Sequence, residues 1–334
     1  MPIILGIESS CDDTAAAVIK GREIVASVIS SQVVHEQYGG VVPELASRDH
    51  QRLIVPVVEK ALAESGVEKQ DLDAIAVTYG PGLAGSLLVG INFAKALSLG
   101  LDVPIVGVNH LEGHIYSVFL DQKTPSFPYL CLVVSGGHTQ LVLVREGFEQ
   151  EVLGSTRDDA AGEAFDKVAK LLGLGYPGGP KIDQLAKEGN AAFHAFPRSN
   201  LPAYEFSFSG LKTAVLYYLN QFDEGDRKVH VEKHLADICA SFQQAVIDML
   251  LTVLKRAVRR TGIKQVAIVG GVSANAGLRT AVEALGTAEG FDLFIPPVRF
   301  CTDNAAMIAI TGSFKYQSGL TSPLTLTAIP SLKI

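Results

Sequence analysis

The sequence predicts an α/β protein built from two domains of similar plan with an interdomain cleft. The chain has 334 residues, which is room for two domains. A strand–polar turn–threonine–strand unit occurs twice, at residues 6–18 and again at residues 133–142. Repetition of one plan within a chain is typical of duplicated domains. We therefore expect an N-terminal domain at residues 1–125 and a C-terminal domain at residues 126–334, whose last helix could pack back on the N-terminal domain.

Composition excludes several classes of protein. Apolar residues make up 48% of the chain and charged residues 19%, which is typical of a well-packed globular protein. The net charge of −7 gives no overall basic footprint for nucleic acid, so any RNA contact has to be local. The four cysteines form no C-x-x-C pair, which favours a reducing compartment. No signal peptide is visible and no apolar run reaches the length of a membrane span, so we expect a cytoplasmic protein without membrane contact.

The first domain is predicted to open with three strands. Residues 3–8, 14–19 and 23–30 are apolar runs of strand length, separated by short polar turns. The first turn carries Asp12, whose carboxylate could orient a metal-bound water; an ordinary solvated turn is the alternative. A Gly-Gly loop at residues 38–40 and a helix from about residue 43 to 64 follow. After them come a strand at residues 73–79 and an apolar helix from about residue 86 to 99.

Two histidines, His110 and His114, follow the strand predicted at residues 104–108. On a helix, residues four apart share a face, so two imidazoles can aim at one metal ion. In the H-E-x-x-H pattern of zinc peptidases the glutamate comes directly after the first histidine, whereas Glu112 comes two positions after it. A pair of satisfied surface or core histidines is the alternative, so a third ligand is needed to favour a metal site.

The second domain is predicted to begin with strands at residues 129–135 and 139–144, joined by a Gly-Gly turn. A helix opens after Asp159 and runs to about residue 172, and a rigid Pro-Gly loop leads into a helix that carries Asp183. A long amphipathic helix from about residue 233 to 260 ends in four basic side chains. These side chains either complement the negative pole of the helix or contact RNA phosphates.

The last elements offer two further candidate residues. A strand at residues 266–269 ends in two glycines before a helix, which lets backbone N–H groups approach a nucleotide. Asn275 could contact a ribose or base there, or could simply cap the helix. A strand at residues 291–295 precedes the last long helix, which Asp303 could cap. If the two domains close a cleft, Asp303 is instead the third ligand of a metal at His110 and His114.

These segments together resemble one family, the TsaD family of bacterial transferases that build N6-threonylcarbamoyladenosine in tRNA, formerly described as O-sialoglycoprotein endopeptidases. The resemblance implies two RNase H-like domains of the actin-like and sugar-kinase-like ATPase superfamily. Its motifs span nearly the whole chain: GIESSCDDT (6–14), YGGVVPELASRDH (38–50), GPGLAGSLLVG (80–90), NHLEGH (109–114), VSGGHTQL (134–141), DDAAGEAFDK (158–167), YPGGP (176–180), FSFSGLKT (206–213), GGVSAN (270–275) and CTDNAAMIA (301–309).

The resemblance also implies the site residues. The family's metal ligands fall on His110, His114 and Asp303, which implies one divalent metal ion per subunit, iron or zinc. Its contacts to the nucleotide and the threonylcarbamoyl group fall on nine positions of this chain: Val133, Val134, Ser135, Gly136, Gly137, Asp166, Gly179, Asp183 and Asn275.

The implied reaction transfers the threonylcarbamoyl group of threonylcarbamoyl-AMP to N6 of adenosine 37, in tRNAs that read codons starting with A, and releases AMP. The implied partners are tRNA, threonylcarbamoyl-AMP or ATP/ADP, an inactive TsaB-like paralogue that forms a heterodimer, and a small TsaE-like ATPase. We expect direct transfer assisted by the metal. Asp12 would accept the N6 proton or orient a metal-bound water, and backbone N–H groups around Ser135 would hold the developing negative charge.

Three other functions compete with this interpretation. A small-molecule kinase could use the same fold, because fold alone does not determine function, but it would give the two histidines no role. A metallopeptidase is disfavoured by the position of Glu112. A non-catalytic scaffold switched by a nucleotide would not need a complete metal triad. The sequence gives no placement for the tail at residues 320–334.

Overall fold

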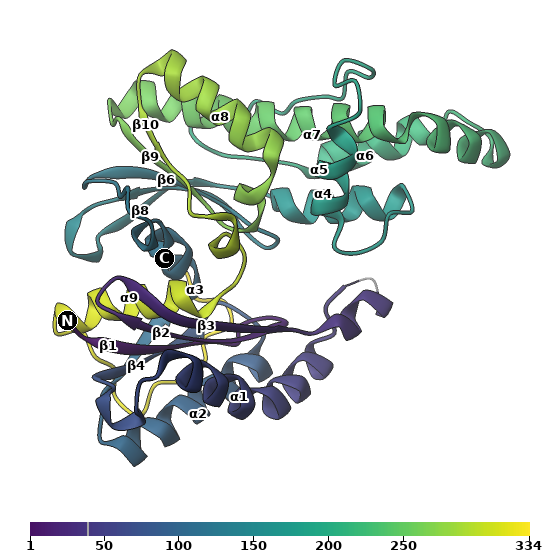
Figure 1. Cartoon of the computed structure of the whole chain (residues 1–334). Coiled ribbons are helices and arrows are strands. Elements are labelled where there is room, and N and C mark those ends of the chain that lie inside the picture. Colours follow the sequence, from purple (N-terminus) through teal and green to yellow (C-terminus); the bar gives the residue numbers. More distant parts are fainter. Residues whose placement is uncertain (39) are drawn as a thin grey trace. The chain divides into compact units, whose positions relative to one another are not determined.

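The protein consists of two compact units in a computed structural model that describes residues 1–38 and 40–334. The first unit comprises Met1–Thr124 and Pro296–Ile334, and the second comprises Pro125–Ile295 (Figure 1). Gly39, in the predicted Gly-Gly loop, lies outside the described residues. The observed units differ from the expected domains at the C-terminal end of the chain. The whole segment after residue 295 belongs to the first unit, and not only the last helix of the chain.

The two units repeat one sheet topology. In the first unit the strand order is β3-β2-β1-β4-β5, and in the second it is β8-β7-β6-β9-β10. In both, the first three strands in sequence pair antiparallel and the last two run parallel to the first. This repetition matches the plan predicted from the two strand–turn–threonine–strand units and confirms the α/β class.

The first unit follows the sequence pattern closely. Its strands are β1 (Ile3–Glu8), β2 (Asp13–Lys20), β3 (Glu23–Ser31), β4 (Ala74–Gly80) and β5 (Ile105–Asn109). Its helices are α1 (Pro43–Ser65), α2 (Ala84–Leu101), α3 (His110–Tyr116) and α9 (Ala305–Gln317). Each predicted strand and helix is present, with ends shifted by one or two residues.

Side-chain size decides which helices cover each face of the first sheet. Large apolar side chains of β1, such as Leu5 and Ile7, pack in one core with α1 and α2. The other face carries small residues and packs against α9. A Cβ built on Gly6 would lie 2.4 Å from the backbone oxygen of Ala305, so this glycine is required for the close approach of α9.

The C-terminal tail, residues 320–334, is hydrogen-bonded along the ends of β4 and β5. Ser322 N donates to Ile105 O (2.8 Å), and Ile329 N donates to Tyr79 O (2.8 Å). Near its end, Lys333 O accepts a hydrogen bond from Asn109 Nδ2 at 3.2 Å. The tail therefore satisfies backbone groups at the exposed side of β5 and reaches the residue that caps α3.

The second unit combines its sheet with five helices. The strands are β6 (Tyr129–Val134), β7 (Thr139–Val144), β8 (Gln150–Ser155), β9 (Gln265–Val269) and β10 (Asp292–Phe294). The helices are α4 (Ala161–Leu171), α5 (Gly178–Ala186), α6 (Ser209–Leu219), α7 (Glu224–Thr261) and α8 (Ala276–Glu289). The start predicted for the long helix coincides with a kink of α7 at His234, where φ is −119° and ψ is 20°.

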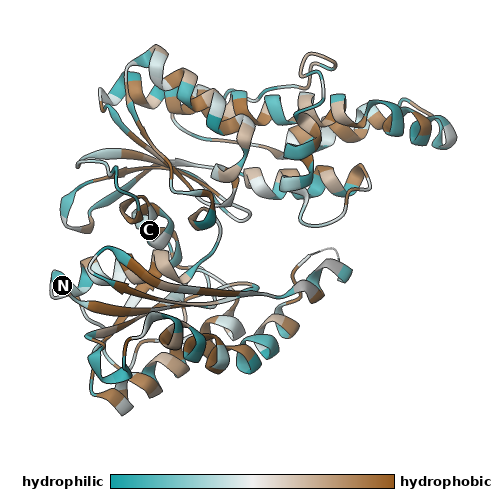
Figure 2. Cartoon of the chain, in the orientation of Figure 1, coloured by the Kyte–Doolittle hydropathy of each residue, from teal (hydrophilic) through white to brown (hydrophobic). Residues whose placement is uncertain are grey.

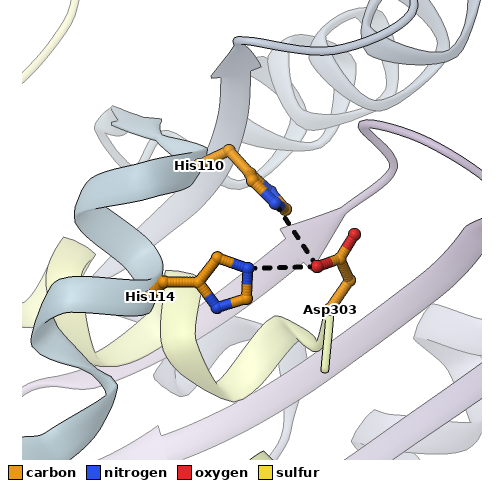
Figure 3. A group of neighbouring side chains, drawn as sticks. All are labelled: His110, His114 and Asp303. Atoms are coloured by element: carbon orange, nitrogen blue, oxygen red, sulfur yellow. Dashed lines mark hydrogen bonds and ion pairs between the residues drawn. The ribbon is translucent and has the colours of Figure 1, made fainter. Parts of the chain in front are cut away.

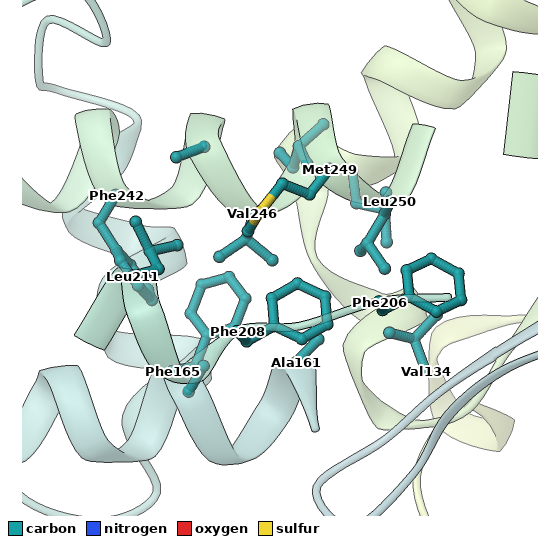
Figure 4. Close-up of a cluster of buried hydrophobic side chains, with 14 of the residues drawn as sticks. Val134, Ala161, Phe165, Phe206, Phe208, Leu211, Phe242, Val246, Met249 and Leu250 are labelled. Atoms are coloured by element: carbon teal, nitrogen blue, oxygen red, sulfur yellow. The ribbon is translucent and has the colours of Figure 1, made fainter. Parts of the chain in front are cut away.

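An aromatic and aliphatic core holds the second unit together. Phe165 of α4 and Phe242 of α7 meet edge to face with their ring centroids 5.2 Å apart. Phe206 and Phe208 precede α6 and pack under α7 (Figure 4). Most strands of the two sheets are dominated by hydrophobic residues (Figure 2), whereas β8, with the sequence QEVLGS, is largely polar. This core fixes α4, α5 and α8, which carry or adjoin the predicted nucleotide contacts Asp166, Gly179, Asp183 and Asn275.

Two helices, α2 and α7, are long and apolar enough to cross a membrane by length and composition alone. The expectation that no apolar run reaches that length is therefore corrected. In α7, 72% of the apolar window is buried in the unit, which is typical of the core helix of a globular domain. In α2 the share is 33%, and Leu88 and Leu99 are exposed.

Candidate functional site

The histidine pair lies on α3, at the end of β5. Asn109 ends the strand and caps the helix, because its Oδ1 accepts a hydrogen bond from Leu111 N at 2.9 Å. His110 and His114 then lie one helical turn apart on one face, with ring centroids 4.9 Å apart. Both side chains are buried. The i, i+4 spacing thus produces the convergence that the sequence predicts.

Asp303 lies two residues before α9 and faces the two histidines (Figure 3). Its Oδ1 is 3.1 Å from His114 Nε2 and 3.3 Å from His110 Nε2. The alternative role of Asp303 as a helix cap is wrong, because Asn304 caps α9 by accepting from Met307 N. The expectation that the triad joins two domains is also wrong: all three residues lie in the first unit.

The three side chains fit a divalent metal ion. One nitrogen from each histidine and one carboxylate oxygen lie within 4.8 Å of one another. Metal–donor bonds of about 2.0–2.2 Å place neighbouring donors about 3.0–3.5 Å apart, which matches the two distances to Asp303 Oδ1. Two imidazoles and one carboxylate suit iron or zinc and leave coordination positions for substrate.

The electrostatics of the triad favour a cation. Burial opposes a charge on His110, but the carboxylates of Asp303 and Glu8 outweigh it and hold the His110 pKa well above its usual value. Burial likewise opposes the charge of Asp303, but His110 and His114 outweigh it and hold the Asp303 pKa well below its usual value. The carboxylates around the imidazoles thus create a negative environment in which either protons or a metal ion are favoured.

Glu112 has a structural role. Its Oε2 accepts a hydrogen bond from Lys315 Nζ at 2.5 Å, and both side chains are largely buried. This ion pair ties α3 to α9 and directs Glu112 away from the two imidazoles. A metallopeptidase needs its glutamate beside the metal-bound water, so the geometry agrees with the sequence in disfavouring that function.

Glu8 is a site residue that the sequence reasoning missed. It ends β1, is 1% exposed, and lies 3.0 Å from His110 Nδ1 through its Oε2. Burial raises its pKa, but His110 outweighs that effect, so the Glu8 pKa is lowered. The available signal was a single carboxylate at the end of an otherwise apolar strand, because such a residue is seldom fully buried without a partner.

The turn between β1 and β2 carries Asp12 in the first unit. His50 of α1 holds this turn: its Nδ1 is 2.7 Å from Thr14 Oγ1, and its Nε2 is 3.0 Å from Cys11 O. Burial, opposed by a hydrogen bond from Ser31, raises the pKa of Asp13 to about 6. Asp13 is therefore a second carboxylate at this turn, next to Asp12 in the chain.

The Gly-Gly turn after β6 has a defined hydrogen-bond pattern in the second unit. Val133 and Val134 end the strand and are fully buried. Ser135 N donates to His138 O (2.8 Å), and Ser135 Oγ accepts from His138 N (3.1 Å). The N–H of Ser135 is therefore used within the turn, which corrects its expected role in holding negative charge.

Gly136 and Gly137 remain available at this turn. Both are exposed, and a Cβ built on either would meet nothing within 4 Å. Among the described residues, neither backbone N–H finds an acceptor in the protein. Packing of the unit does not require glycine at these two positions, so the open backbone suits close approach of a ligand.

Two of the remaining predicted contacts, Asp166 and Asp183, accept hydrogen bonds from the N-termini of neighbouring helices in the second unit. Asp166 Oδ1 accepts from Gly178 N at 2.7 Å, at the start of α5, and hydrogen-bonds Gly179 N as well. Asp183, on α5, accepts from Ala276 N at 3.1 Å through Oδ2. Burial raises the pKa of Asp166 despite those hydrogen bonds. A line of carboxylate–helix contacts therefore joins α4, α5 and α8.

Asn275 caps α8 through Oδ1, which accepts from Leu278 N at 2.8 Å. Its Nδ2 donates to Gln243 Oε1 at 2.7 Å. The capping role left open by the sequence is thus the one observed, and the second amide hydrogen is what remains for a ligand. Beside it, Asp183 Oδ1 and Ser273 Oγ are buried without a hydrogen-bond partner among the described residues. Buried polar atoms of this kind favour a ligand that would complete them.

The basic end of α7 is structural. Arg259 and Lys255 both pair with Glu289, at 2.7 and 3.1 Å. Arg256 donates to the backbone oxygens of Leu201 and Ala203. Arg260 lies over the Tyr204 ring, with its guanidinium carbon 5.9 Å from the ring centroid. All four basic side chains thus contact the second unit, which supports a packing role for this end of the helix.

Comparison with known proteins gives one consistent result. The family model described as TsaD, tRNA N6-adenosine threonylcarbamoyltransferase, matches residues 23–310. A relative of that name from Salinibacter ruber is 60% identical over 99% of this chain and 100% of its own. Another of that name from Cytophaga hutchinsonii is 53% identical, over 99% and 96%. Among solved structures, the activator of 2-hydroxyisocaproyl-CoA dehydratase from Clostridium difficile has a TM-score of 0.54 at 16% identity, over 95% and 96% of the two chains.

Proposed function

Because the chain belongs to the TsaD family of tRNA N6-adenosine threonylcarbamoyltransferases, we propose the specific reaction that its residues perform. The threonylcarbamoyl group of threonylcarbamoyl-AMP is transferred to N6 of adenosine 37, in tRNAs that read codons starting with A. The N6 nitrogen attacks the carbamoyl carbon and forms a C–N bond, the bond from that carbon to the phosphate oxygen breaks, and AMP leaves. The high identity to the family over nearly the full chain is the observation that carries this proposal.

We propose that His110, His114 and Asp303 hold one divalent metal ion per subunit, iron or zinc. When bound, such an ion supplies Lewis acidity that polarises a carbonyl or phosphoryl oxygen. The convergence of the three donor atoms supports this assignment. The buried surroundings support it as well, because a low dielectric strengthens binding of a cation to carboxylate and imidazole ligands.

The chain's other residues bind substrate and move the proton. The free N–H groups of Gly136 and Gly137 hold negative charge that develops on the transferred group. The AMP portion is oriented by Asp166, Gly179, Asp183 and Asn275. A hydroxyl group of AMP would donate the hydrogen bond that the buried Asp183 Oδ1 lacks. Val133 and Val134 support the Gly-Gly turn from β6. Asp12 accepts the N6 proton or orients a metal-bound water.

Direct transfer needs no covalent enzyme intermediate, so the cysteines are dispensable as nucleophiles. Burial, then Asp12 and Asp303, raises the Cys11 pKa far above its usual value, and burial raises the Cys239 pKa to about 12. Thiols held in the neutral form are poor nucleophiles. We expect Cys11→Ser, Cys131→Ala and Cys301→Ser to keep the transfer rate within about threefold of wild type. A labelled threonylcarbamoyl adduct on the protein, lost with one of these substitutions, contradicts direct transfer.

Partners complete the proposed activity. We propose that the chain acts in the cytoplasm with an inactive TsaB-like paralogue as a heterodimer and a small TsaE-like ATPase, without membrane contact. The exposed apolar side chains Leu88 and Leu99 on α2 suit a protein partner. The net charge of −7 supports dependence on partners for tRNA binding, because tRNA binding rests largely on phosphate neutralisation.

Mass spectrometry of tRNA tests this function. Unmodified tRNA with an anticodon for codons starting with A is incubated with the chain, both partners and threonylcarbamoyl-AMP. We expect the mass of one threonylcarbamoyl group at adenosine 37, and little product when the partners are left out. Robust repeated turnover by the isolated chain contradicts the dependence on partners, and absence of product in the complete mixture contradicts the reaction.

A further inference from the structure

Glu8 is a buried carboxylate whose two oxygens are both engaged. Its Oε1 accepts a hydrogen bond from Ser10 N at 2.5 Å. Its Oε2 accepts from Thr78 Oγ1 at 2.7 Å and lies 3.0 Å from His110 Nδ1. Thr78 lies on β4, so the carboxylate is held by neighbouring strands of the sheet. A buried carboxylate costs several kcal/mol unless it is fully hydrogen-bonded, and these contacts hold it in one position.

The contact with Glu8 determines which nitrogen of His110 carries a proton. An ionised carboxylate only accepts hydrogen bonds, so the nitrogen that faces it, Nδ1, has to donate. Ser10 Oγ, 3.1 Å from the same nitrogen, can donate or accept and therefore imposes no choice. With the proton on Nδ1, the lone pair of a neutral His110 lies on Nε2. That nitrogen is the one that faces Asp303.

His114 has no equivalent support. Its Nε2 faces Asp303, and its Nδ1 is buried without a hydrogen-bond partner among the described residues. Glu112, the acidic residue between the two histidines, is engaged with Lys315. In the part of the chain that the structure describes, the outer nitrogen of only one triad imidazole is thus held by a carboxylate.

We propose that Glu8 is a positioning residue for the metal centre: it fixes the tautomer and ring orientation of His110 and thereby tightens metal binding. This role rests on the proposed metal ligands His110, His114 and Asp303. Carboxylates that hold the outer nitrogen of a ligating histidine typically contribute about 10- to 100-fold in metal affinity. Thr78 and Ser10 act one step further out, because they orient Glu8 itself.

The substitution Glu8→Gln removes the negative charge of the side chain and keeps its shape. An amide has one oxygen and one NH₂ group. If the oxygen faces Ser10 N, the NH₂ group faces His110 Nδ1 and favours the other tautomer, which puts a proton on Nε2. If the oxygen faces His110, the NH₂ group faces the N–H of Ser10, so that two hydrogen-bond donors meet. Either orientation conflicts with the observed arrangement, so a neutral isostere cannot replace the carboxylate.

The test is titration of the metal-free full-length protein with Co²⁺, followed by the visible absorption of the bound ion. We expect Glu8→Gln to raise the Kd for Co²⁺ by about 10- to 100-fold and to change the absorption band. The matched control is Glu112→Gln, which removes a largely buried carboxylate from α3 that pairs with Lys315 and does not contact the histidines. We expect the Kd of this control to stay within about threefold of wild type.

A second variant keeps the proposal testable if Glu8→Gln does not fold. Thr78→Val keeps the shape of the side chain and removes one donor to Glu8 Oε2 without contacting His110; we expect a smaller rise of the Kd. Wild-type affinity in Glu8→Gln, or in Thr78→Val where only that variant folds, overturns the role of Glu8. So does an equal loss in Glu112→Gln. A wild-type protein that binds no Co²⁺ overturns the metal centre itself.

Discussion

His110→Ala is expected to remove the bound metal and the transferase activity together. The substitution leaves His114 and Asp303 as ligands, and it leaves Glu8 as a buried carboxylate without its imidazole partner. A metal acting as a Lewis acid contributes several kcal/mol of transition-state stabilisation, and each 1.36 kcal/mol is a factor of ten. We therefore expect the rate of transfer to fall by at least about 10³-fold.

Metal analysis of the purified protein, alongside the tRNA modification assay, measures both effects. The matched control is His230→Gln, which removes a histidine from the second unit, where its Nε2 lies 2.7 Å from Tyr218 Oη. This variant should retain wild-type metal content. Full metal occupancy in His110→Ala contradicts the ligand assignment, whereas lost activity with intact occupancy gives His110 a different role.

The sequence predicts the histidine pair because its signal is local: two histidines four residues apart share one face of any helix. The assignment of Asp303 as third ligand rests instead on the resemblance to the TsaD family. The repeated strand–turn–threonine–strand unit likewise predicts two sheets of one topology. Both patterns involve residues that are close in the sequence, so they can be recognised without knowledge of the tertiary structure.

The position of α9 is not a local property. Nine consecutive residues of this helix, 305–313, are buried, so its sequence lacks a polar face that would mark one side. It belongs to the first unit because Gly6, Ala15, Ala17 and Ala76 leave room for its backbone on that sheet. Complementarity of two small-residue surfaces far apart in sequence is visible only after folding.

Hydrogen-bond partners are a second limit of sequence reasoning. The motifs place Ser135 and Asn275 correctly near their turns, but the structure commits Ser135 N to His138 O and both ends of the Asn275 amide to protein groups. Conversely, Glu8 is a site residue only because β4 and α3 bring Thr78 and His110 to it. Residue type and spacing identify candidate residues, whereas tertiary contacts determine which of their polar atoms lack a partner in the protein.

Gly6→Ala is expected to destabilise the first unit and to weaken metal binding at once. The new Cβ would lie 2.4 Å from Ala305 O and 2.7 Å from Ala309 N, which are backbone atoms of α9 and cannot rotate away. The helix has to shift, and Asp303 lies only two residues before its first residue. Overpacking of this kind costs about 1–3 kcal/mol, occasionally more. The shift also moves Asp303 away from the two imidazoles. We expect metal affinity to fall at least about tenfold, as it does when the residues that orient a metal ligand are removed.

The matched control is Gly100→Ala, a glycine inside α2 whose added Cβ would meet nothing within 4 Å. Since alanine is the better helix former, this variant should be more stable than wild type by about 0.5–1 kcal/mol. Urea unfolding and Co²⁺ titration of both variants measure the contrast. We expect the free energy of unfolding to fall in Gly6→Ala and to rise in Gly100→Ala, and metal affinity to be lost only in Gly6→Ala. If Gly6→Ala keeps wild-type stability and affinity, the close contact between β1 and α9 does not position Asp303.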